Sequence, residues 1–154
     1  MANQSKPGID GFTITIALKK CGADVFRAIT EDVAKWWGGN DLKGSSTKLN
    51  DEFVICHEGA HYSKQRLVEV LPDKKVVWLV TESELNWLHK DKQEWTNTKM
   101  IFEIAVDGEK TLLHFTHEGL VPEKECYLLC HEGWNTVIKD YLYNFINEGK
   151  AYFQ

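Results

Sequence analysis

The sequence predicts an α+β domain, in which a curved antiparallel sheet of six or seven strands is crossed by one long C-terminal helix, with two short helices near the start. Three observations support this prediction. Turn residues divide most of the chain into short alternating apolar segments, residues 126–149 have helical periodicity, and the chain carries six tryptophans. So many large aromatic side chains predict that helix and sheet enclose a cavity.

Composition limits the class of protein. The 154 residues fit one domain, 1–154, with residues 1–10 as a loose polar tail. The net charge of −5 argues against nucleic-acid partners, which require a basic surface. No apolar run reaches the ~18 residues of a membrane span, and the N-terminus lacks a signal-peptide core. We therefore expect a cytoplasmic location, with the four cysteines as buried thiols.

The first elements are a strand and two short helices. Residues 12–18 alternate with period two and predict a half-buried strand. Residues 24–29 have helical spacing, and Thr30 is placed to cap a second short helix that carries Trp36 and Trp37 on one face. Gly38 and Gly39 end that helix.

The middle of the chain predicts the rest of the sheet. Residues 40–51 form a loop or a weak edge strand, and residues 82–96 form the longest irregular stretch. The pair Asp107-Gly108 is a strong hairpin signal. The predicted strands are 53–58, 61–71, 76–81, 99–106 and 111–117.

The last helix has an apolar stripe. At ~100° per residue this stripe contains Cys126, Leu129, Cys130, Gly133, Trp134, Val137 and Tyr141. Leu128, Leu142 and Ile146 fall outside it. Gly133 costs about 1 kcal/mol against alanine in a helix, so either the sheet approaches closely there or space is left open.

Aromatic side chains supply the predicted apolar lining of the cavity. The candidates are Trp36, Trp37, Phe53, Trp78, Trp95, Phe102, Phe115 and Trp134. Taken one by one, plain core packing is the simpler interpretation for most of them. Cys130 joins the lining because a small residue in the helix stripe leaves room beneath the helix.

Three polar residues are candidates for orienting a ligand. His117 shares a strand face with Leu113 and Phe115, and so points inward. It either contacts a ligand, as a hydrogen-bond partner or general acid–base, or makes a structural hydrogen bond to the backbone where the strand meets the helix. Tyr62 and Arg66 lie at alternate positions of one strand, on the face that we expect to point inward. For Arg66 a surface position is the alternative.

Metal and cofactor signatures are weak. His57 and His61 flank a predicted turn, but two ligands without a third favour surface histidines over zinc. Cys126 and Cys130 lie one helical turn apart and are simplest as core thiols, with metal binding or redox chemistry as the alternative. No glycine-rich phosphate loop or nucleophile elbow occurs. We expect no metal, no cofactor and no catalytic residue.

The sequence resembles a known family across about residues 12–150. The residues that carry the resemblance are Phe26, Thr30, Trp36-Trp37, Arg66–Val70 before Pro72, Trp78, Trp95, Thr98, Phe102–Ile104, Thr111, Thr116–Leu120 and Gly133-Trp134. Their order resembles the START-like, or Bet v 1-like (SRPBCC), helix-grip fold. The more specific resemblance is to bacterial proteins similar to the C-terminal domain of the activator of the Hsp90 ATPase.

This resemblance implies a cavity between a curved sheet and the long helix. Members of the superfamily bind lipids, hormones or polyketides, and a few act as cyclases, so fold does not settle function. The first expectation is non-enzymatic binding of a small, largely hydrophobic molecule, lipid-like or aromatic. The alternatives are a co-chaperone-like interaction with a chaperone or homodimer partner, and a cyclase- or hydrolase-like enzyme using His117 or Tyr62.

Overall fold

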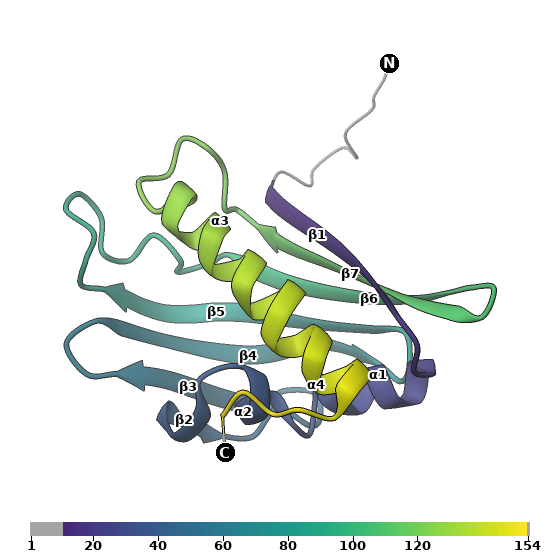
Figure 1. Cartoon of the computed structure of the whole chain (residues 1–154). Helices are drawn as coiled ribbons and strands as arrows, with labels where there is room; N and C mark the ends of the chain where they lie inside the picture. Colours follow the sequence, from purple (N-terminus) through teal and green to yellow (C-terminus); the bar gives the residue numbers. More distant parts are fainter. Residues whose placement is uncertain (1–10, 154) are drawn as a thin grey trace.

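The computed structural model describes residues 11–153, which form one antiparallel sheet crossed on one face by a long C-terminal helix (Figure 1). The seven strands lie in the order β1-β7-β6-β5-β4-β3-β2. Their bounds are β1 Gly11–Leu18, β2 Leu42–Gly44, β3 Glu52–His57, β4 His61–Leu71, β5 Lys75–Leu85, β6 Lys99–Asp107 and β7 Lys110–Glu118. The predicted α+β helix-grip fold is confirmed.

The helices are two short ones near the start and one continuous helix at the end. Their bounds are α1 Gly22–Ala28, α2 Val33–Trp36, the 3₁₀ turn η1 Gly39–Asp41, α3 Tyr127–Thr136, the π-helical segment η2 Val137–Leu142 and α4 Tyr143–Glu148. In residues 11–153 no helix is long and apolar enough to cross a membrane. The tail predicted at residues 1–10 lies outside the described residues.

Strand alternation sets the buried face of the sheet. Phe12, Ile14, Ile16 and Leu18 of β1 are all buried, as predicted from their period of two. They pair across the ladder with His117, Phe115, Leu113 and Thr111 of β7, which are buried on the same face. β5 continues four residues beyond its predicted end at Thr81, so the irregular segment is residues 86–98, called here the β5–β6 loop.

The predicted face of β4 is wrong. Ser63, Gln65 and Leu67 are its buried residues, so Tyr62 and Arg66 lie on the outer face of the sheet. The ladder between β4 and β5 has register shifts at Lys64/Gln65 and Leu67/Glu69. A shift of one residue exchanges the inner and outer faces of a strand. The alternation seen after Leu67 therefore does not predict which face Tyr62 and Arg66 occupy.

The second short helix begins differently from the prediction. Asp32 precedes α2, and Thr30 belongs to the end of α1, where its Oγ1 donates a 2.7 Å hydrogen bond to the carbonyl of Phe26. Trp36 is fully buried and its Nε1 donates to the carbonyl of Ala28. Trp37 has extended backbone and is half-buried, and its ring stacks on Trp78 at 5.8 Å, as that of Trp36 does at 6.3 Å.

The π-helical segment rotates the buried face of the C-terminal helix. The apolar residues that it buries are Cys126, Cys130, Trp134, Ile138, Leu142 and Ile146, a repeat of four rather than 3.6. The wider turn of η2 shifts the stripe by one position, which brings Leu142 and Ile146 into the core. The prediction that Leu129 lies on the buried stripe is wrong, since it is 64% exposed.

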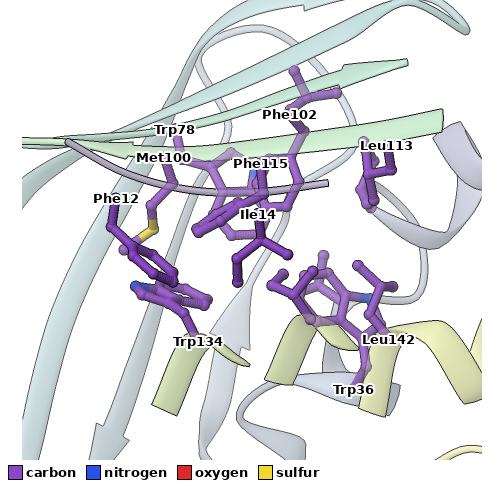
Figure 2. Packing of buried hydrophobic residues seen from close by; sticks show 14 of the residues in the cluster. Phe12, Ile14, Trp36, Trp78, Met100, Phe102, Leu113, Phe115, Trp134 and Leu142 are labelled. Atoms are coloured by element: carbon purple, nitrogen blue, oxygen red, sulfur yellow. The ribbon is translucent and has the colours of Figure 1, made fainter. Parts of the chain in front are cut away.

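Closely packed aromatic rings fill the space under the middle of the helix. Figure 2 shows Phe102 and Phe115 of the sheet pointing toward the helix and Trp134 pointing back at them. The ring centroids of Phe115 and Trp134 are 4.6 Å apart, as are those of Trp78 and Phe102. Trp36 extends this layer from α2, 6.2 Å from Phe102.

Candidate functional site

A pocket opens at the N-terminal end of the long helix. It has a volume of about 170 Å³ and lies between α3, the β5–β6 loop and the start of β4. Its lining residues are Trp37, His61, Trp87, Trp95, Leu129, Cys130, Gly133, Trp134 and Val137. Four of the six tryptophans of the chain therefore border one pocket.

Two carboxylates fix the loop to the helix and hold the pocket in shape. Glu94 of the β5–β6 loop accepts hydrogen bonds from the backbone N–H groups of Glu125 and Cys126, at 2.9 and 3.1 Å. In return the Glu125 carboxylate accepts from the backbone N–H groups of His89 and Lys90, and these bonds lower its pKa. The loop and the first turn of α3 are thus joined in both directions.

Gly133 keeps the helix side of the pocket open. A Cβ atom built at this position would meet no atom within 4 Å. Of the two explanations that the sequence left for this glycine, open space is the one the structure supports. The open side faces the pocket mouth rather than the sheet, because Gly133 is exposed and the adjacent Trp134 is the residue that packs inward.

His61 is the histidine that lines the pocket. Its ring packs edge-on against Trp95 at 5.1 Å and against Trp37 at 6.4 Å, and its Nε2 lies 2.8 Å from Ser63 Oγ. Burial, together with the nearby His57, lowers the pKa of His61 to about 4, so the ring is neutral at pH 7. Its Nδ1 makes no hydrogen bond to any other described residue and remains a free acceptor or donor.

Trp95 places a second free polar group beside Cys130. Its side chain is 6% exposed, and its buried Nε1–H has no hydrogen-bond partner of standard geometry within residues 11–153. A buried donor without a firm partner is unfavourable by about 1–3 kcal/mol unless a ligand or water pairs with it.

His117 lies inside the molecule rather than in the pocket. Its predicted inward orientation is confirmed, and it is fully buried. Trp134 Nε1–H donates to His117 Nδ1 at 3.0 Å, which leaves Nε2 as the protonated nitrogen, 2.9 Å from Thr98 Oγ1. The Thr98 hydroxyl donates in turn to the carbonyl of Trp95.

Both ring nitrogens of His117 are therefore occupied in a structural link between the helix, β7 and the β5–β6 loop. Burial, together with the charge of Lys124, lowers the pKa of His117 to about 3. The structural alternative given by the sequence is the one that this geometry supports. The hydrogen bonds run to side chains of Trp134 and Thr98 rather than to the backbone.

The structure separates the twelve predicted ligand-contacting residues into three groups. Trp37, Trp95, Cys130 and Trp134 meet in the pocket. The packed interior holds Trp36, Phe53, Trp78, Phe102, Phe115 and His117. Tyr62 and Arg66 lie on the outer face of the sheet, where the Tyr62 hydroxyl donates to Glu82 at 2.7 Å and has its pKa raised to about 12.

Sequence reasoning missed five of the pocket residues as ligand contacts. They are His61, Trp87, Leu129, Gly133 and Val137. Gly133 was the detectable signal, because a glycine in the middle of a long helix requires a local explanation. No sequence signal placed Trp87 and His61 in the pocket, because their positions depend on the path of the β5–β6 loop and on the register of β4.

The metal candidates do not converge. His57 Nδ1 lies 3.1 Å from Asp41 Oδ2 on the surface, whereas His61 bonds to Ser63. In the part of the chain that the structure describes, no group of three or more potential ligands is placed to hold a metal ion. Tyr62 and His117, the two alternative acid–base residues of a cyclase- or hydrolase-like site, do not face the pocket: the Tyr62 hydroxyl donates to Glu82 on the outer face of the sheet, and both His117 nitrogens are in hydrogen bonds.

Comparison of the structure with solved proteins gives the same fold repeatedly. The solution structure of an Aha1 dimer from Colwellia psychrerythraea matches 93% of this chain and 100% of its own, with 19% identity and a TM-score of 0.74. CalU16 from Micromonospora echinospora matches 87% of this chain and 72% of its own, with 16% identity and a TM-score of 0.63.

A third similar structure belongs to a larger protein. DynU16, described as a putative protein in the dynemicin biosynthetic locus, matches 90% of this chain, with 13% identity and a TM-score of 0.66. The present chain spans only 48% of its length. At these identities the likeness establishes the fold and not the activity.

Family assignment comes from the sequence model. No functionally curated protein matches the chain. Residues 22–146 match the model described as Activator of Hsp90 ATPase homolog 1-like protein, which covers most of the sequence from α1 to the last buried turn of α4. The chain therefore belongs to the Activator of Hsp90 ATPase homolog 1-like protein family.

Proposed function

We propose that the protein binds a small, largely apolar ligand in the pocket between α3 and the β5–β6 loop. The observation that carries this proposal is the convergence of Trp37, Trp87, Trp95 and Trp134 on one open space that the packed interior does not fill. Burial of an apolar ligand against these rings supplies the affinity, at about 25 cal/mol per Å².

The pocket volume is suited to about one aromatic ring. Drug-sized ligands occupy pockets of about 300–1,000 Å³, whereas an apolar cavity of about 150 Å³ holds benzene. At about 170 Å³ the pocket is suited to a ligand of about the size of benzene. Of the two ligand types expected from the sequence, this favours an aromatic molecule over a lipid-like one.

Two polar groups add a preference for a hydrogen-bonding substituent. The Trp95 Nε1–H offers a donor, and the unpaired Nδ1 of His61, whose ring packs edge-on against Trp95, offers a second contact. An acceptor such as a carbonyl oxygen on the ring would satisfy the buried N–H of Trp95. An apolar ring without an acceptor would leave it unpaired, so we expect weaker binding.

The indole N–H signals of the six tryptophans offer a direct test. Titration of ¹⁵N-labelled protein with acetophenone should shift the signals of Trp37, Trp87, Trp95 and Trp134. Those of Trp36 and Trp78 should stay in place, because they lie in the packed layer. Ethylbenzene should bind more weakly, and palmitate should leave all six unchanged. Equal shifts at all six indoles, or none with acetophenone, would refute the proposal.

A blocking variant locates the ligand. Gly133→Leu places a side chain in the open space at the pocket mouth, so it should abolish the acetophenone shifts while the protein stays folded. Glu132→Leu adds the same side chain to the neighbouring exposed helix position and serves as the matched control. Unchanged binding in Gly133→Leu would place the ligand elsewhere.

A second candidate function is a co-chaperone-like interaction, which the family description and an exposed apolar surface favour. Leu128 and Leu129 are 74% and 64% exposed on α3, and Leu129 lines the pocket together with the exposed Trp87. We expect this surface to contact an Hsp90 homologue from the same organism. Stimulation of its ATPase activity that is lost in Leu128→Ser/Leu129→Ser would support the interaction, and no stimulation by the wild-type protein would exclude it.

A further inference from the structure

Trp37 belongs both to the pocket and to the packed interior. Its ring lines the pocket, where its centroid lies 5.2 Å from that of Trp134 and 6.5 Å from that of Trp95. It also stacks on Trp78 of the filled layer, with centroids 5.8 Å apart and planes 7° from parallel. A molecule that took the place of this ring would therefore reach the interior from the pocket.

Trp37 is held less firmly than its neighbour Trp36. Trp36 is fully buried, and its Nε1–H donates to the Ala28 carbonyl at 2.8 Å. Trp37 is half-buried, and within residues 11–153 its ring nitrogen makes no hydrogen bond. Moving the Trp37 ring thus breaks ring contacts alone, whereas moving Trp36 would also break a buried hydrogen bond.

The inner face of the sheet places Gln65 of β4 beneath the Trp37 ring. Gln65 is fully buried and follows His61 by four positions on the same strand face. Its cross-strand partner in β3 is Phe53, and Trp78 lies two residues from its partner in β5. Trp37 contacts the rings of His61, Phe53 and Trp78 at centroid distances of 6.4, 6.4 and 5.8 Å. Gln65 is therefore the polar residue of the sheet that these ring contacts surround.

Three buried polar groups around Trp37 have no hydrogen-bond partner. Among residues 11–153 five buried side-chain nitrogen or oxygen atoms are unpaired, and three of them are Gln65 Oε1, Trp78 Nε1 and Trp95 Nε1. The Gln65 Nε2 donates to the Phe53 carbonyl at 3.4 Å, which identifies Oε1 as the free acceptor. Because buried polar groups are almost always paired, their gathering at one place favours a ligand that supplies the missing partners.

We propose that displacement of the Trp37 ring opens a deeper subsite of this pocket, which binds a planar molecule of two fused rings carrying a carbonyl and an N–H group. The ligand N–H donates to Gln65 Oε1, and the ligand carbonyl accepts from Trp95 Nε1–H. The face of the ligand packs on Trp78, where the Trp37 ring now lies. This subsite extends the pocket of the proposed function and rests on it.

The shape and polarity of the ligand follow from what it replaces. The pocket of about 170 Å³ takes about one ring, and the indole of Trp37 is itself a planar pair of fused rings. A ligand stacked on Trp78 cannot pair with the N–H of that indole, which lies in its own ring plane, so the two hydrogen bonds are assigned to Gln65 and Trp95. The pocket lining includes no carboxylate, ammonium or guanidinium group, which favours an uncharged ligand.

The fused-ring lactam 2-quinolone is the probe for this subsite. In the ¹⁵N-labelled wild-type protein it should shift the indole N–H signal of Trp78, which acetophenone should leave in place. The Trp37 signal should shift as well, because its ring moves away from Trp78. A response confined to the other pocket tryptophans, with Trp78 unchanged, would overturn the proposal.

Trp37→Ala removes the ring that the ligand has to displace. The affinity for 2-quinolone, measured by isothermal titration calorimetry, should rise about tenfold, because no binding energy is needed to move the ring. Trp87→Ala removes another tryptophan of the pocket wall and is the matched control, in which the affinity should not rise. An affinity of Trp37→Ala no higher than that of the wild type contradicts the proposal, and the wild-type Trp78 signal decides it if this variant does not fold.

A methyl group on the ligand tests the role of Gln65. The compound 1-methyl-2-quinolone lacks the N–H and should bind the wild-type protein about tenfold more weakly than 2-quinolone. Gln65→Leu should remove that difference, whereas Gln93→Leu, the same exchange at an exposed loop position, should keep it. Equal affinities of the two compounds for the wild-type protein would reject the proposed recognition.

Acetophenone binding keeps this result distinct from the proposed function. Acetophenone shifts without a Trp78 response to 2-quinolone would reject only the deeper subsite. Absence of binding by both compounds would reject the pocket as a ligand site as well.

Discussion

The aromatic layer under the middle of the helix and the aromatic pocket at its N-terminal end are built from the same residue types, but only the first is filled. In the layer, Trp78 lies between Phe102 at 4.6 Å and Phe53 at 5.0 Å, and both are fully buried. In the pocket, Trp87 and the stacked pair Trp95 and Trp134 line an open space. Aromatic content therefore does not by itself indicate a binding site.

Their histidines differ in the same way. His117, at the boundary of the filled layer, has both ring nitrogens in hydrogen bonds. His61, in the pocket, uses one nitrogen for Ser63 and leaves the other free. Both are kept neutral by burial, so what separates the structural histidine from the candidate ligand contact is the number of occupied nitrogens.

The largest test of this comparison is truncation in each region. Phe115→Ala should lower the free energy of unfolding by about 3–5 kcal/mol, because it leaves a cavity in the packed layer. Trp87→Ala should change it by less than about 1 kcal/mol, since its ring is exposed at an open space. Urea denaturation measures both, and equal losses would show that the pocket wall is as tightly packed as the layer.

The second-largest effect is expected at the hydrogen bonds that run from Trp134 through His117 and Thr98 to the Trp95 carbonyl. Thr98→Val leaves the His117 Nε2–H and the Trp95 carbonyl without their shared partner, so we expect a loss of about 1–3 kcal/mol in unfolding free energy. Thr13→Val, at an exposed position of β1, is the matched control and should be nearly neutral. A loss in Thr98→Val no larger than the control would show that the chain contributes little.

Acidification should destabilise the fold before the carboxylates titrate. The pKa of His117 is about 3 in the folded state against about 6.5 unfolded, so the unfolded state binds the proton first as the pH falls. Its contribution is complete above pH ~6.5 and should fall by about 2 kcal/mol by pH 5. His61, with a folded pKa of about 4, loses a similar amount over the same range. Chemical denaturation at pH 7 and pH 5 measures the sum of the two losses, and His61→Gln should remove the second.

The smallest effect concerns the open side of the pocket. Gly133→Ala removes the entropic cost of a helical glycine, and the added methyl group meets no atom within 4 Å. We expect a gain of about 0.5–1 kcal/mol in unfolding free energy, seen as a higher melting temperature. A decrease would mean that the helix requires glycine there for a reason other than space.

Much of the fold followed from local pattern, but the site did not. The period of two in β1 and the hairpin at Asp107-Gly108 predicted the strands correctly because side-chain alternation is a property of the backbone. Tyr62 and Arg66 were assigned to the wrong face because register shifts in β4 are set by its partner strand. Of the pocket, Trp37, Trp95, Cys130 and Trp134 were anticipated.

The sequence alone determined the antiparallel sheet, the long C-terminal helix and the inward position of His117, since each depends on periodicities of two or 3.6 residues. Only the tertiary structure decided where space remains open. That choice depends on the π-helical turn that brings Leu142 and Ile146 into the core, and on the Glu94 and Glu125 bonds that fix the β5–β6 loop. The Glu94 and Glu125 bonds join residues 31 and 35 positions apart, which no local pattern encodes.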